Sequence, residues 1–136
     1  MNLDQALSDI DKIERLAEGL TRRRDDIYLL LTEIYRVGRK WIKQAPRGLK
    51  RNLIARLDRS FDRRTTRSAF RFLIEVTLKK IDPKAKQRYA NALRYGHMRH
   101  CPSQQLAEFI KRSGGIEKCE DRFLAARKAS ATQLRR

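Results

Sequence analysis

Arginines gather in one short segment of the chain, in a pattern that suits the binding of phosphate groups. The segment RSFDRRTTRSAF (59–70) holds four arginines, and Arg71 follows it directly. The planar guanidinium group of arginine donates two parallel hydrogen bonds to a phosphate. A solvated helix face that happens to be basic is the alternative interpretation. We predict phosphate contacts from this segment and its basic neighbours, at Lys50, Arg51, Arg59, Arg63, Arg64, Arg67, Arg71 and Lys79.

Two histidines and two cysteines form a second set of residues with possible chemistry. His97, His100 and Cys101 lie within GHMRHC, and Cys119 follows later in the chain. All four are types that bind zinc, but the usual spacing Cys-x2-Cys or His-x3-His is absent. Helical spacing places His100 on the side of Leu93, as expected for a histidine at the edge of a core. We therefore predict no metal and no cofactor, with zinc at these four residues as the minor alternative.

Patterns typical of enzymes are absent from the sequence. It contains no glycine-rich phosphate loop, no nucleophile motif and no HExxH. The acidic residues of segment 36–100 are Asp58, Asp62, Glu75 and Asp82, and their scattered spacing does not suggest a two-metal centre. Glu75 lies among basic residues, so we expect it to form a surface ion pair. These observations predict a protein that is not an enzyme.

The charge of the chain is high and unevenly distributed. The 136 residues include 33 Lys and Arg against 16 Asp and Glu, a net charge of +17. Residues 1–35 carry 5 basic and 8 acidic side chains, whereas residues 36–100 carry 20 and 4, a net of +16. Such an excess attracts polyanions, of which nucleic acid is the most common. The 22 arginines outnumber the 11 lysines, which also favours nucleic acid.

No segment of the sequence directs the chain to a membrane. The N-terminus is acidic and does not resemble a signal peptide. The longest apolar run, IYLLL at 27–31, is far too short to span a bilayer. We expect a cytoplasmic protein with no membrane contact, whose two cysteines are free thiols.

The spacing of apolar residues predicts an all-α fold, a compact bundle of five to seven short amphipathic helices. A single domain should cover 1–130, with an acidic-leading hairpin or long helix at 1–45 and a basic helical core at 47–130. A frayed basic tail should follow at 131–136. Helices are expected at about 49–61 and 66–80, which together with 103–127 offer possible helix-turn-helix units.

Local signals predict where several helices begin and end. Thr65 or Thr66 can cap the helix at 66–80, and Ser103 can cap a later one. The pair Asp82-Pro83 should open another helix, because proline suits a first helical turn. The Gly-Gly pair at 114–115 should end one.

The first helix carries an apolar stripe close to a heptad pattern, flanked by acidic residues. Leu3, Leu7 and Ile10 lie on this stripe. Such a helix can pair with a partner helix as easily as with its own core. We predict a partner protein, or self-association, through these three residues. Aromatic platforms for single strands are possible at Trp41, Phe72 or Tyr95, although such residues more often belong to a core.

Three stretches carry a resemblance to known sequences. AFRFLIEVTL (69–78), KQRYANALRY (86–95) and EFIKRSGGIEKC (108–119) resemble a group of small, basic, uncharacterised bacterial proteins. The similarity covers roughly 65–125. It transfers no functional residue and implies only a structural signature, at Tyr89, Leu93, Gly114, Gly115 and Ile116.

Together these patterns predict a non-enzymatic protein that binds the phosphate backbone of DNA or RNA, within a nucleoprotein assembly or as a DNA-associated accessory or regulatory factor. A structural small subunit of a ribonucleoprotein, similar to CRISPR small subunits in size, charge and helicity, is one alternative. A basic protein-binding inhibitor module is the other.

Overall fold

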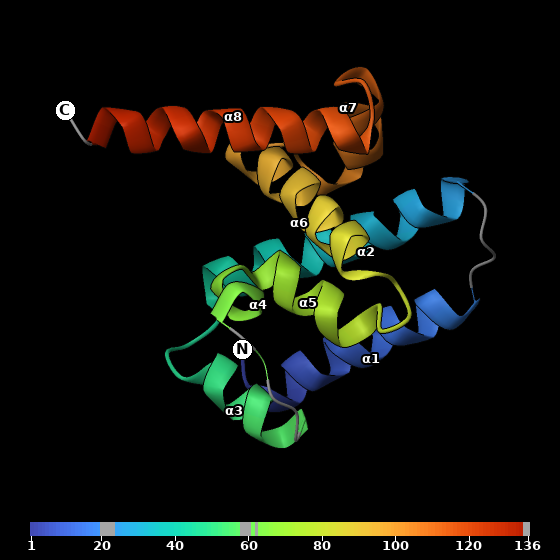
Figure 1. The fold of residues 1–136 in the computed structure, drawn as a ribbon. Helices are drawn as coiled ribbons and strands as arrows, with labels where there is room; N and C mark the ends of the chain where they lie inside the picture. Colours follow the sequence, from blue (N-terminus) through green and yellow to red (C-terminus); the bar gives the residue numbers. More distant parts are fainter. Residues whose placement is uncertain (20–23, 58–60, 62, 135–136) are drawn as a thin grey trace.

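The described part of the chain is built from helices and contains no strand, which confirms the predicted all-α fold (Figure 1). A computed structural model describes residues 1–19, 24–57, 61 and 63–134, with the backbone alone at 24, 25, 63, 64 and 132–134. The helices, in chain order, are α1 (Leu3–Gly19), α2 (Arg24–Gln44), α3 (Leu49–Leu57), α4 (Arg63–Arg67), α5 (Ala69–Thr77), α6 (Pro83–Met98), the 3-10 turn η1 (Ser103–Gln105), α7 (Leu106–Arg112) and α8 (Ile116–Leu134). None of these helices combines the length and the apolar composition that crossing a membrane requires.

The central element of the fold is α5, which packs against α1, α2, α4 and α6. Its apolar residues point in nearly every direction, as in a helix surrounded by protein. The rings of Phe70 and Tyr35 stack at 5.6 Å, and that of Phe72 lies 6.3 Å from Trp41. Trp41 and Phe72 are therefore core residues rather than exposed platforms. The buried residues of α5 are Phe70, Phe72, Leu73, Ile74, Val76 and Thr77.

Close packing between α2 and α5 depends on a glycine of α2. A β-carbon placed on Gly38 would lie 2.5 Å from two ring carbons of Phe70. This distance is shorter than any normal contact between carbon atoms. Gly38 therefore sets how closely the two helices approach.

The helices α1 and α2 form a hairpin, which decides between the two arrangements that the sequence left open (Figure 1). Asp9 of α1 is buried, and its Oδ2 accepts a hydrogen bond of 3.0 Å from Nε1 of Trp41. The Nζ of Lys40 lies 2.7 Å from the same oxygen. These polar contacts hold α1 against α2 beside the core.

The apolar stripe of α1 is used within the chain, which corrects the prediction of a partner surface. Ile10 is 4% exposed, and Leu3 and Leu7 are partly buried against the same core. The stripe packs on α2, α3 and α5 because the hairpin turns it inward.

Helix boundaries follow the predicted signals in some places and depart from them in others. The helix α6 begins at Pro83 as predicted, and Asp82 caps it by accepting a 2.7 Å hydrogen bond from the backbone N–H of Lys84. The cap of α5 is Ser68, not Thr65 or Thr66, because those threonines belong to the short α4. The predicted helix at 66–80 is therefore two helices. Of the helix predicted at 49–61, the structure describes Leu49–Leu57 as α3, and positions 58–60 lie outside the described residues.

In the C-terminal part of the chain, too, some helix boundaries agree with the predicted signals and others do not. Gly114 and Gly115 both have positive φ, at 102° and 106°, and they end α7 as predicted. Ser103 makes no capping bond, since Pro102 occupies the cap position before η1. The helix α8 packs on α6 and extends beyond it toward the C-terminus (Figure 1). Its backbone is helical to Leu134, so residues 131–134 do not form the frayed tail that was expected.

Candidate nucleic-acid interface

Several predicted phosphate-binding residues lie on the surface of α3 and α4. Lys50, Arg51 and Arg67 are exposed, and the amino group of Lys50 donates to the backbone carbonyl of Thr66, joining the two helices. Arg56, one turn further along α3, is also exposed. We call Lys50, Arg51, Arg56 and Arg67 the α3–α4 surface. Arg59 and the side chains of Arg63 and Arg64 lie outside the described residues.

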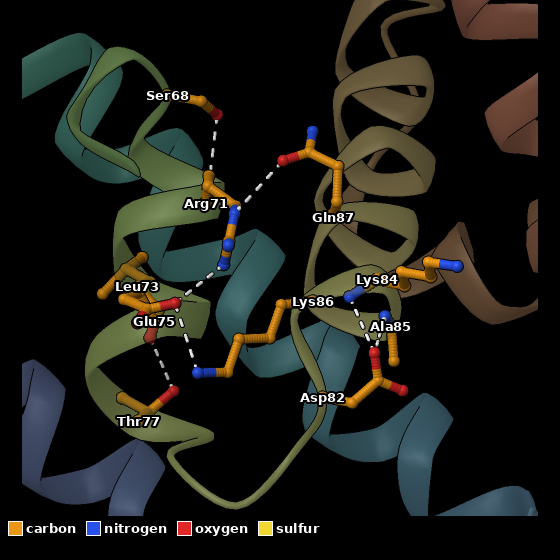
Figure 2. Close-up of polar contacts among 10 residues, drawn as sticks. All are labelled: Ser68, Arg71, Leu73, Glu75, Thr77, Asp82, Lys84, Ala85, Lys86 and Gln87. Carbon is orange, nitrogen blue, oxygen red and sulfur yellow. Dashed lines mark hydrogen bonds and ion pairs between the residues drawn. The ribbon is translucent and has the colours of Figure 1, made fainter. Parts of the chain in front are cut away.

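Arg71 does not belong to this surface, which corrects its prediction as a phosphate ligand. Its side chain is only 12% exposed and points toward α6 (Figure 2). The Nη1 lies 3.0 Å from Oε2 of Glu75, and Nε donates to Oε1 of Gln87 at 3.2 Å. The one-turn spacing to Glu75 and the nearby α6 hold the guanidinium group inside the molecule, away from any phosphate.

The contacts of Arg71 continue as a polar network between α5, α6 and α8. The Nζ of Lys86, whose side chain is 9% exposed, lies 3.2 Å from Oε2 of Glu75 (Figure 2). Gln87 donates to Asn91 at 3.1 Å, and Asn91 donates to Glu120 at 2.9 Å. The ion pair predicted for Glu75 is therefore largely buried rather than on the surface.

This network determines which acidic residues of segment 36–100 are available to neutralise exposed basic side chains. Of the four acidic residues in segment 36–100, Glu75 is engaged with Arg71 and Lys86, and Asp82 caps α6. Asp58 and Asp62 lie outside the described residues. The acidic groups described in this segment thus have structural roles, and within the described residues neither Glu75 nor Asp82 forms an ion pair with Lys50, Arg51, Arg56 or Arg67. Lys79 is also exposed, with its Nζ 3.9 Å from Oε1 of Glu14 on α1.

The helix that would read DNA in a helix-turn-helix at 49–80 is α5. Such a helix projects from a domain so that it can enter the major groove. In this fold α5 is instead enclosed by α1, α2 and α6, and its N-terminal turn is capped by Ser68. The geometry of this segment suits contact with a backbone through α3 and α4 rather than base contacts through α5.

The histidines and cysteines do not form a metal centre within the described residues, where no three His, Cys, Asp or Glu side chains are placed to hold a metal ion. Cys101 and Cys119 are free and buried, and burial raises the pKa of both thiols. His97, not His100, lies at the edge of the core, with its ring 5.8 Å from that of Phe70. Burial lowers the pKa of His97, and the charge of Arg39 lowers it further.

A groove that the sequence did not suggest lies where α2, α6 and the turn between α7 and α8 meet. Its volume is about 510 Å³. It combines aromatic and cationic side chains: Tyr28, Tyr89, Arg88 and Lys111. Because these residues come from three separate segments, no local spacing could have identified the group. Tyr95, which was considered as a stacking platform, instead packs against Phe109 at 5.6 Å.

Comparison of the chain with protein-family models, with curated proteins and with solved structures gives no significant match. The resemblance noted over residues 65–125 therefore stays a prediction, and the function must be argued from the site itself.

Proposed function

We propose that this protein is a non-enzymatic nucleic-acid-binding protein that holds a phosphate backbone on the α3–α4 surface. The observation that carries the proposal is the contrast between two neighbouring sets of charges. Arg71 and Lys86 face inward toward Glu75, whereas Arg51 and Arg67 face solvent. Within the part of the chain that the structure describes, Arg51 and Arg67 form no ion pair, so both are available to replace the counterions of a polyanion.

Backbone contacts of this kind hold a nucleic acid without selecting a base sequence. The protein would therefore act as a component of a larger nucleoprotein assembly, or as an accessory factor on DNA, rather than as a reader of one site. The net charge of +16 over residues 36–100 supports the same role, since it would draw any long polyanion to this part of the chain.

The test replaces Arg51 and Arg67 together by alanine and measures binding by fluorescence anisotropy at several salt concentrations. Duplex DNA, single strands and structured RNA are compared in the same titration. Each lost phosphate contact should flatten the log–log salt dependence by about one unit, so the double variant should lose about two. The matched control replaces Lys12 and Arg15, two exposed cations of α1, and should leave the slope close to that of the wild type.

Two results would count against the proposal. If the salt slope flattened equally in the test and control variants, binding would depend only on the overall charge of the protein. An unchanged slope in the test variant would place the phosphates elsewhere, with Lys79, Lys80 and Lys84 as the next candidates.

A further inference from the structure

The groove between α2, α6 and the α7–α8 turn has the size of a ligand site. Its volume of about 510 Å³ lies within the range of about 300–1,000 Å³ that small-molecule sites occupy. Part of this space opens beside Gly115, where an added β-carbon would meet no atom within 4 Å. The turn between α7 and α8, which lines the groove, lies far from α3 (Figure 1), so the groove is a separate feature from the α3–α4 surface.

The aromatic residues of the groove offer ring surface for stacking. Tyr28 of α2 and Tyr89 of α6 are partly buried against the core, and both also line the groove. The Nζ of Lys111 lies 5.2 Å from the centroid of the Tyr28 ring, a cation–π contact. One face of this ring therefore lies under the ammonium group of Lys111, which also lines the groove. Aromatic faces of this kind accept a nucleobase irrespective of its identity.

The basic side chains around the groove could bind the phosphate next to a base that stacks in it. Arg88 and Lys111 both line it. One carboxylate opposes them: Oε1 of Glu117 lies 3.6 Å from Nη1 of Arg88, and the Glu117 side chain is 77% exposed. Because an exposed pair of this kind contributes little, an incoming phosphate can compete for the guanidinium group.

We propose that this groove binds one nucleobase of a single-stranded nucleic acid, stacked on Tyr28 or Tyr89, with the adjoining phosphate held by Arg88 and Lys111. The proposal rests on the proposed function and deepens it, because it names the form of the nucleic acid. Bases of a duplex are stacked on one another and cannot enter such a groove, whereas those of a single strand are free to do so.

The test uses Tyr28→Leu and Tyr89→Leu, which keep an apolar side chain against the core but remove the aromatic face. Binding is measured by anisotropy with oligo(dA), oligo(A) and a duplex of the same length, and stacking by the quenching of one 2-aminopurine in the single strand. We expect each variant that removes a stacking ring to weaken single-strand binding by about 5- to 100-fold. Duplex binding and its salt slope should be unchanged, and Tyr→Phe at the same position should restore the wild-type affinity.

Glu117→Gln provides a second variant at an exposed position, where folding is not in question. Removing this carboxylate should strengthen single-strand binding by about two- to fivefold. The comparison of oligo(dA) with oligo(A) shows whether DNA or RNA is the source of the base.

The outcomes separate this inference from the proposed function. Salt-dependent duplex binding together with leucine variants that bind single strands as tightly as the wild type would overturn the groove proposal alone. Equal losses on duplex and single strand would also overturn it, because they would indicate a general effect on the fold. If the wild type bound no nucleic acid in any form, both proposals would fall.

Discussion

Arg67 and Arg71 lie one helical turn apart in sequence spacing, yet the structure predicts opposite consequences when each is replaced by alanine. Arg71→Ala removes the 3.0 Å ion pair with Glu75 and the hydrogen bond to Gln87. Arg67→Ala removes an exposed side chain of α4. We expect the first variant to lose stability and keep its salt-dependent binding, and the second to do the reverse.

The loss for Arg71→Ala follows from the geometry of the pair. Removing one partner of a buried ion pair costs about 3–5 kcal/mol. Here the cost should be lower, about 2–3 kcal/mol, because Lys86 remains 3.2 Å from Glu75 and the side chains of Arg71 and Glu75 keep 12% and 20% of their exposure. An exposed substitution such as Arg67→Ala should change the free energy of unfolding by no more than about 0.5 kcal/mol.

The assay pairs urea denaturation, followed by the helical circular dichroism signal, with the salt titration of nucleic-acid binding. Arg71→Met is the matched control, since it keeps the aliphatic stem and removes only the charge and the hydrogen bonds. It should lose nearly as much stability as Arg71→Ala. If Arg71→Ala instead unfolded at the wild-type urea concentration and flattened the salt slope, Arg71 would be a phosphate ligand and the reasoning from Figure 2 would be wrong.

Two further predictions concern the core around α2. Gly38→Ala should destabilise the fold by about 1–3 kcal/mol, because its β-carbon would overlap the Phe70 ring; a melting temperature equal to that of the wild type would contradict this. Burial raises the pKa of Tyr35, whose hydroxyl donates to the carbonyl of Cys101 at 2.6 Å, from 10.0 to about 12. The contribution of the protonated Tyr35 hydroxyl to the free energy of unfolding should be fully present below pH 10 and lost as the pH rises toward 12. Absorbance titration of tyrosinate should therefore show a late-ionising group that disappears in Tyr35→Phe, and a wild-type titration without such a group would refute the assignment.

The sequence alone determined the features of this protein that depend on neighbouring residues. Apolar spacing gave the helical class, because a helix repeats its faces every three to four residues wherever it lies in a fold. Asp82-Pro83 and Gly114-Gly115 marked boundaries correctly, since capping bonds and positive φ are local properties of the backbone. The uneven charge was likewise visible without a structure.

The tertiary structure alone decided which side chains are free to act. Arg67 and Arg71 have the same chemistry in the sequence, but among the described residues Arg71 alone of the two meets an acidic partner and the neighbouring α6. Tyr28 and Tyr89 share a groove although 60 positions separate them in the chain. Exposure and proximity depend on how helices pack, and the packing of helices is a sum over distant contacts that no local pattern encodes.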